Sequence, residues 1–259
     1  MGWTAKNVPD QTGKHIIVTG SNSGIGFEAA KVLASRGAHV TLACRNPDKA
    51  SEAQAKILKA HKKATVETGS LDLASLKSIA AFAADYRKKH GKLDILINNA
   101  GVMVPPYGKT EDGFELQFGC NHLGHFALTA QLIDLINAAP EGRVVSVASQ
   151  AHRGGRINFD DLNWEKGYKP WPAYGQSKIA NLYFAYELDR NLRDAGHTTR
   201  ATAAHPGYSS TNLQRTMTAG TIANAIFAQS QKSGALPTLR AATDPDADSG
   251  SYWGPNGIM

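Results

Sequence analysis

Short apolar runs rich in β-branched residues alternate with segments of helical period along most of this 259-residue chain. Such alternation is typical of a doubly wound α/β sheet, because parallel strands need crossover helices that cover both faces. We expect strands at residues 15–19, 39–43, 65–68, 94–97, 143–148 and 200–204, with a last one in the segment SYWGP. Helices are expected over residues 25–35, 49–59, 73–89, 111–137 and 173–193. The sequence therefore predicts a mostly parallel sheet of about seven strands with helices on both faces.

A glycine-rich turn follows the first predicted strand directly. Residues 19–26 read TGSNSGIG and lead into an amphipathic helix, so that part of the chain's total of 25 glycines is concentrated there. Glycines at such a turn allow the backbone to approach a pyrophosphate, which the amides and the helix N-terminus can then bind. Between a strand and a helix, this turn predicts a Rossmann fold that binds a dinucleotide.

The end of the second predicted strand indicates which dinucleotide is bound. In such folds a carboxylate about 20 residues beyond the turn accepts the 2′-hydroxyl of NAD, whereas an arginine suits the 2′-phosphate of NADP. This segment reads ACRN at residues 43–46, with Arg45 and no acidic residue. NADP(H) is therefore favoured, although Arg45 as an ordinary surface residue is the competing interpretation.

A tyrosine and a lysine, Tyr174 and Lys178, lie four residues apart on a predicted helix and so share one face. An ammonium group beside a phenol stabilises the phenolate, which lowers the tyrosine pKa and suits the phenol for proton transfer to or from a substrate oxygen. The spacing alone is common, so its meaning depends on the motifs that accompany it.

Five motifs occur in one order along the chain: TGxxxGxG at 19–26, NNAG at 98–101, Ser149 after the fifth strand, YxxxK at 174–178, and HPG at 205–207. In this order the sequence resembles the short-chain dehydrogenases/reductases over nearly its full length. The segments FGCNHLGHFALT, SQAHRGGRINFDDLNW and AYGQSKIANLYF are similar to the branch that contains retinol dehydrogenases and protochlorophyllide reductase.

The resemblance implies a role for each matching residue. Tyr174 would be the general acid/base, and Lys178 would lower the pKa of Tyr174 and bind the nicotinamide ribose. Ser149 would bind the substrate oxygen. Asn121 would hold a water that connects Lys178 to solvent. The cofactor-binding set would be Gly20, Asn22, Gly24, Ile25, Gly26, Arg45, Asp72, Leu73, Asn99, Tyr174, Lys178, Pro206, Gly207 and Thr211. Ser149 is the expected catalytic serine rather than Ser146, because a strand alternates its side chains and Ser146 should face the other side of the sheet.

The expected activity is an NADP(H)-dependent interconversion of a carbonyl and an alcohol by hydride transfer, in the reducing direction. One alternative is NADPH-dependent reduction of a conjugated carbon–carbon double bond with the same tyrosine and lysine. Another is a regulator that senses NADP(H) without turnover, which the intact catalytic set disfavours.

The chain, residues 1–259, is expected to be one dinucleotide-binding oxidoreductase domain, because single α/β domains of this size are common. Residues 208–233, which mix a short apolar stretch with Ser, Thr and Gly, are interpreted as a substrate flap. The expected partner is a small carbonyl or alcohol compound, and the resemblance is consistent with a homo-oligomer. No apolar run approaches a membrane span, so neither an anchor nor a signal peptide is expected, and the expected compartment is the cytoplasm.

Neither nucleic acid nor a metal ion is expected as a partner. The net charge is +6 at pH 7, but the basic runs lie at predicted helix ends without interleaved aromatic residues. Two cysteines without CxxC spacing predict no zinc site of that type, and His122 and His125 are interpreted as packing residues. The aromatic residues Trp164, Tyr168 and Trp171 could either wall a substrate pocket or cover the loop that precedes residue 173.

Overall fold

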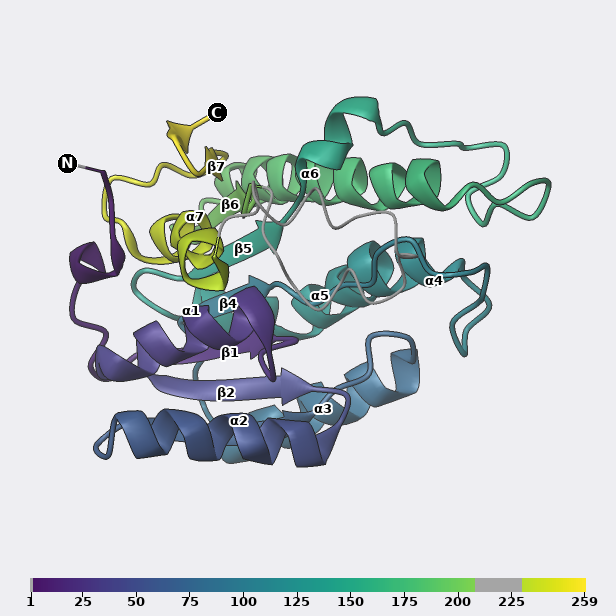
Figure 1. Ribbon diagram of the computed structural model, residues 1–259. Coiled ribbons are helices and arrows are strands. Elements are labelled where there is room, and N and C mark those ends of the chain that lie inside the picture. Colours follow the sequence, from purple (N-terminus) through teal and green to yellow (C-terminus); the bar gives the residue numbers. More distant parts are fainter. Residues whose placement is uncertain (1, 208–229) are drawn as a thin grey trace.

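The computed structural model describes residues 2–207 and 230–259 (Figure 1). Among these residues the sheet has eight strands in the order β3-β2-β1-β4-β5-β6-β7-β8. The strands are β1 (His15–Thr19), β2 (His39–Cys44), β3 (Thr65–Ser70), β4 (Ile95–Asn98), β5 (Arg143–Val147), β6 (Arg200–Ala204), β7 (Tyr252–Gly254) and β8 (Gly257–Ile258). Every neighbouring pair is parallel except β7 and β8. The predicted mostly parallel sheet is confirmed, and β8 is added to it as an antiparallel edge strand.

Helices cover both faces of this sheet. They are α1 (Gly24–Ser35), α2 (Pro47–Ala60), α3 (Leu76–Lys89), α4 (Leu116–Phe118), α5 (Gly124–Asn137), α6 (Pro170–Asp194) and α7 (Gln231–Thr243), with short turns η1 (Ala5–Asn7), η2 (Gly119–Leu123) and η3 (Gln150–Gly154). Alternation along β1 divides the core, since Ile16 and Val18 pack with α1, α2 and α7, whereas Ile17 packs with α3 and α5. None of the described helices has the length and apolar character needed to cross a membrane.

The strand order creates a crevice between β1 and β4. From β1 the chain builds the sheet outward through β2 and β3 and then returns to β4 on the other side of β1. The crossover helices diverge at this point, so the carboxyl ends of β1 and β4 are left open for a ligand. The predicted motifs after these strands consequently meet at one edge of the sheet.

Two predicted helices begin later than the sequence pattern indicates. The helix expected over residues 73–89 begins at Leu76 because Ser75 caps it by accepting from the backbone N–H of Ser78 at 3.3 Å. The segment expected as one helix over residues 111–137 begins at Leu116, after a turn in which Gly113 has φ of +88°. It also passes through the π-helical turn η2 before α5 begins.

The segment interpreted as a flap over residues 208–233 is corrected at its C-terminal end. Residues 208–229 lie outside the described residues, whereas Ser230 caps α7, which begins at Gln231. The sequence pattern missed α7 because Gly234 and Pro237, both unfavourable inside helices, lie in its first two turns. Its buried residues, such as Leu239, complete the core beside α1.

Candidate active site

A cleft of about 780 Å³ opens at the carboxyl ends of the parallel strands. The predicted site residues that line it are Gly20, Asn22, Gly24, Ile25, Gly26, Arg45, Asp72, Leu73, Asn99, Ser149, Tyr174, Lys178, Pro206 and Gly207. Asn121 lies behind this lining, and Thr211 lies outside the described residues. The structure thus brings together residues that are separated by up to 187 positions in the sequence (207 − 20 = 187).

The glycine turn is packed so closely that two of its positions admit no side chain. Gly20 has φ of +66°, and a Cβ there would lie 2.9 Å from both Cα and Cβ of Ala100. A Cβ on Gly26 would overlap the side-chain amide of Asn99 and lie 2.9 Å from the Gly20 carbonyl oxygen. Glycine therefore lets the first turn of α1 approach the loop after β4, and the residues of this turn line the cleft.

A hydrogen-bond network fixes the loop after β4 to the end of β1. Thr19 Oγ1 accepts from the backbone N–H groups of Asn99 and Ala100, both at 2.9 Å, and Asn99 Nδ2 donates to the Thr19 carbonyl oxygen at 2.8 Å. His125 Nε2 is 2.9 Å from Thr19 Oγ1, and its Nδ1 is 3.0 Å from the Asn121 carbonyl oxygen. No sequence motif indicates this contact between Thr19 and His125, because the two residues are more than 100 positions apart.

The end of the cleft beside β2 and β3 combines an exposed cation with hydrogen-bonded turns. Arg45 is exposed directly after β2, and Asn46 accepts from the Lys49 N–H at 2.9 Å and so caps α2. Asp72, which follows the neighbouring strand β3, also lines the cleft and accepts from the Ala74 N–H at 2.9 Å. Arg45 is thus the side chain at the end of β2 that is available to an anionic group of a ligand.

Ser149 and Tyr174 are hydrogen-bonded to each other in the cleft, where they arrive from the end of β5 and from the first turns of α6. Burial raises the pKa of Tyr174 to about 12, and the hydrogen bond with Ser149 acts in the opposite direction. The expected lowering of this pKa by Lys178 is wrong here, since burial of the phenol prevails. Ser146 is buried and does not line the cleft, in agreement with the alternation of side chains along β5.

Lys178 is buried one turn of α6 beyond Tyr174. Its Nζ donates to the Val147 carbonyl oxygen at 3.1 Å and lies 5.6 Å from the centre of the Tyr174 ring. Burial lowers the pKa of Lys178 to about 8, because the surroundings disfavour the ammonium ion. Most Lys178 side chains are still protonated at pH 7.

Asn121 connects the loop after β4 to α6. Its Oδ1 accepts from the Val102 N–H at 2.8 Å, and its Nδ2 donates to the Val102 carbonyl oxygen and to Ser177 Oγ, both at 2.9 Å. The side chain points from the π-helical turn η2, a feature that often marks functional positions. The geometry therefore gives Asn121 a positioning contact beside Lys178, and the water that the resemblance assigns to it stays a prediction.

Two histidine rings contact the backbone of Ser149 and Gly207. His152 Nδ1 is 2.6 Å from the Ser149 carbonyl oxygen and 3.3 Å from the Tyr252 hydroxyl. His205 Nδ1 accepts from the Gly207 N–H at 3.1 Å, and burial lowers the pKa of His205 to about 4. A neutral His205 with its proton on Nε2 follows. Only the HPG motif at residues 205–207 could have indicated the contact between His205 and Gly207 in advance.

Of the remaining aromatic and histidine candidates, only Trp171 lines the cleft among the described residues. Trp171 lines the cleft and meets the Tyr174 ring edge to face, whereas the Tyr168 hydroxyl donates to the Pro105 carbonyl oxygen at 2.9 Å and holds the loop. Trp164 is not part of the cleft lining. Burial lowers the pKa of both His122 and His125 to about 4.

Comparison with known sequences places the chain in a family. The family model described as short chain dehydrogenase matches residues 14–221. Human retinol dehydrogenase 13 is 48% identical over 204 residues, a match that covers 78% of this chain and 61% of the human protein. Mouse retinol dehydrogenase 12 is 43% identical over 246 residues, covering 93% of this chain and 77% of the mouse protein.

Solved structures give the same result for the fold. An uncharacterized protein of Mycobacterium paratuberculosis is 44% identical, with a TM-score of 0.83 over 98% of this chain and 85% of that chain. A short chain dehydrogenase of Shigella flexneri 2a, solved in complex with NADP, is 22% identical, with a TM-score of 0.76 over 95% of this chain and 98% of that chain. At that lower identity the likeness concerns the fold alone.

Proposed function

The chain belongs to the short-chain dehydrogenase family, and from this premise we propose that it is an NADP(H)-dependent oxidoreductase that interconverts a carbonyl and an alcohol. One observation carries the proposal: Ser149, Tyr174 and Lys178 line the same cleft as the glycine turn. A phenol and a hydroxyl beside a dinucleotide site are the groups that a carbonyl reduction needs.

The residues of the cleft fit such a cofactor. Gly20 and Gly26 leave room where a Cβ would collide with neighbouring atoms, and the N-terminus of α1 would offer its first amides to a pyrophosphate. Arg45 would bind the 2′-phosphate, while Asp72, Leu73 and Asn99 would contact the adenosine half. When bound, NADPH supplies the hydride that reduces the carbonyl carbon.

Tyr174 and Ser149 would act on the substrate oxygen. In the reducing direction the neutral phenol donates its proton to the oxygen as negative charge develops there, and Ser149 donates a hydrogen bond to the same atom. A Tyr174 pKa of about 12 supports this assignment, because the phenol is then fully protonated at neutral pH and remains a stronger acid than an ordinary alcohol. The reverse reaction would use the same groups in the opposite order.

Lys178 is proposed to keep positive charge next to the reacting phenol, which leads to a pH prediction. Its pKa of about 8 lies below that of an ordinary lysine, so the charge is lost as the pH rises through 8. We expect kcat/KM for carbonyl reduction to be level from pH 6.5 to 7, to halve near pH 8 and then to fall by about tenfold per pH unit. Initial rates of NADPH consumption between pH 6.5 and 9.5 measure this profile.

The variant Lys178→Arg provides the control for this profile. A guanidinium stays charged throughout the range, so the variant should be slower at pH 7 but should lack the decline near pH 8. A level wild-type profile up to pH 9.5, or an identical decline in Lys178→Arg, would contradict the role of the Lys178 charge.

The substrate is proposed to be an apolar aldehyde or ketone. Met103, Trp171 and Pro172 form part of the cleft wall near Tyr174, and apolar walls of this kind favour apolar ligands. The curated relatives named above are retinol dehydrogenases, so retinal belongs among the test compounds. Their match to this chain covers only 61% of human retinol dehydrogenase 13, and the substrate therefore has to be measured rather than transferred.

A screen of NADPH consumption against apolar aldehydes, ketones and quinones tests the proposed activity. Deuterated NADPH distinguishes the two enzymatic alternatives, because deuterium appears on the carbinol carbon after carbonyl reduction and on a former alkene carbon after double-bond reduction. A chain that binds NADPH but transfers no deuterium to any compound of the screen would favour the sensing regulator.

A further inference from the structure

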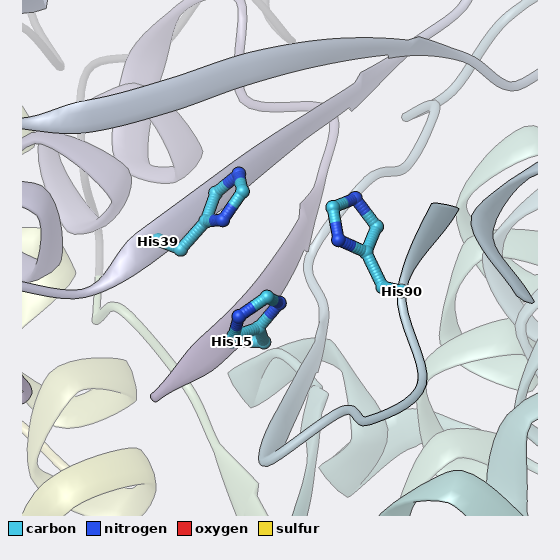
Figure 2. Close-up of side chains that lie close together, drawn as sticks. All are labelled: His15, His39 and His90. Carbon is cyan, nitrogen blue, oxygen red and sulfur yellow. The ribbon is translucent and has the colours of Figure 1, made fainter. Parts of the chain in front are cut away.

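Three imidazole rings meet at the edge of the sheet opposite to the cleft. His15 begins β1, His39 begins β2, and His90 follows the last residue of α3. The ring centres lie 4.7 Å apart for His15 and His39, 5.2 Å for His15 and His90, and 5.1 Å for His39 and His90. Figure 2 shows the three rings around one shared space, into which each projects from a different element.

The fold explains why these rings converge. His15 and His39 are partners in the β1–β2 register, so their side chains lie next to each other on one face of the sheet. That face is the one covered by α3, since Ile17, two residues beyond His15, packs with the α3 core. The C-terminal end of α3 then brings His90 over the first residues of both strands.

The nitrogens of this cluster include one without a partner. Nδ1 of His15 is buried and makes no hydrogen bond within residues 2–207 and 230–259. Nε2 of His90 is 2.7 Å from Glu67 Oε1, which also accepts from Thr41 Oγ1 at 2.7 Å and lies 3.7 Å from His39 Nε2. When the Nε2–H of His90 donates to Glu67, its Nδ1 is left as an acceptor.

We propose that His15, His39 and His90 form a binding site for a divalent metal ion of the zinc type, with Glu67 orienting His90. One ligand nitrogen from each ring can be chosen so that all three lie within 4.8 Å of one another. A tetrahedral zinc ion with Zn–N bonds of about 2.0–2.1 Å requires nitrogens about 3.4 Å apart. Rotation of these partly exposed side chains about χ1 and χ2 can close the difference.

The chemistry of the surrounding groups supports zinc over magnesium or calcium. Imidazole is a ligand for zinc, copper and nickel, whereas magnesium and calcium take oxygen ligands. A ligating histidine usually donates the N–H of its other ring nitrogen to a carboxylate, which fixes the orientation of the ring. Other charged residues also lie around the cluster. Asp94 Oδ2 accepts from the His15 backbone N–H at 2.7 Å and lies 3.5 Å from Lys92 Nζ. Lys89 Nζ pairs with Asp85 Oδ2 at 2.7 Å.

The protonation of the rings also fits a metal site. Burial lowers the pKa of both His15 and His39, which favours the neutral ring whose lone pair a metal ion needs. The Tyr86 ring, 4.8 Å from His90, closes the cluster on the α3 side.

The position of the cluster gives the metal a structural rather than a catalytic role. His15 and Thr19 are at opposite ends of β1, roughly 13 Å apart at about 3.3 Å per residue. A metal at the His15 end cannot reach the hydride-transfer site. It would instead connect β1, β2 and the end of α3, so this proposal does not depend on the proposed activity.

Calorimetric titration of the full chain with ZnCl₂ tests the site, with protein that has no polyhistidine tag and has been treated with a chelator. We expect one zinc ion per chain with micromolar or tighter Kd, and a rise in Tm of roughly 5–10 °C at a zinc concentration about 100 times Kd. Co²⁺ in place of zinc should give visible d–d absorption with the intensity of a tetrahedral site. No binding, or zinc that binds without these three rings, would overturn the proposal.

Variants identify the ligands. His90→Ala should weaken zinc binding by at least 100-fold, and Glu67→Gln, which removes only the orienting carboxylate, by about 10-fold to 100-fold. His197→Ala, a change at an exposed histidine after α6, should leave Kd unchanged. Equal affinities in wild type and His90→Ala contradict the site. If His90→Ala does not fold, Glu67→Gln and the Co²⁺ spectrum of the wild type decide.

Discussion

Replacement of Tyr174 by phenylalanine is expected to lower kcat/KM for carbonyl reduction by about 10²-fold to 10⁴-fold, the usual contribution of a positioned general acid. The ring and its packing remain, so only the proton donor is removed. Ser149 Oγ keeps its hydrogen bond from the Ala151 N–H at 3.3 Å and is not left unpaired. The fold should consequently change little, and the loss should appear in turnover rather than in the amount of folded protein.

Steady-state rates with the best carbonyl compound of the screen measure this effect, together with NADPH binding by fluorescence. Tyr183→Phe is the matched control, because Tyr183 lies on the same helix with 56% of its surface exposed. We expect wild-type turnover from Tyr183→Phe. If Tyr174→Phe also turns over at nearly the wild-type rate, Tyr174 is not the general acid.

The centre of the sheet was predictable because strands such as β4 and β5 are buried on both faces. The prediction of β1 at residues 15–19 and of β6 at 200–204 matches the structure residue by residue, since in both strands the residues after the first are buried. The edge strand β8 and the helix α7 were harder to predict from the sequence. β8 has two residues, and α7 contains Gly234 and Pro237, so both depend on tertiary contacts that override local propensity.

The cleft residues follow the same logic. The glycine turn and the Tyr174–Lys178 spacing are local patterns, and a parallel sheet necessarily brings the carboxyl ends of its strands to one edge. The contacts between Thr19 and His125 and the meeting of His15, His39 and His90 join residues far apart in the sequence. No local pattern records them, and the pKa of Tyr174 was misjudged because burial cannot be read from a four-residue spacing.

The proposed preference for NADPH over NADH depends on Arg45. Its guanidinium is exposed at the end of β2 and lines the cleft, and the segment 43–46 contains no carboxylate that could bind a 2′-hydroxyl. A charge-assisted hydrogen bond to a phosphate contributes about 1.5–3 kcal/mol, which corresponds to roughly 10-fold to 150-fold in affinity. NADH has no phosphate at this position, so its affinity should depend little on Arg45.

Arg45→Ala should therefore raise the Kd of NADPH by about 10-fold to 100-fold and that of NADH by less than about 3-fold. Fluorescence titrations at low salt measure both, since screening weakens the contribution of an exposed charge. Arg190→Ala removes the same charge from α6, 12 residues beyond Lys178 (190 − 178 = 12) and so roughly 18 Å further along the helix, and should change neither Kd. Equal losses for the two cofactors in Arg45→Ala would mean that Arg45 supports the cleft in general. A loss confined to NADPH would mean that this one side chain distinguishes the two cofactors through the 2′-phosphate.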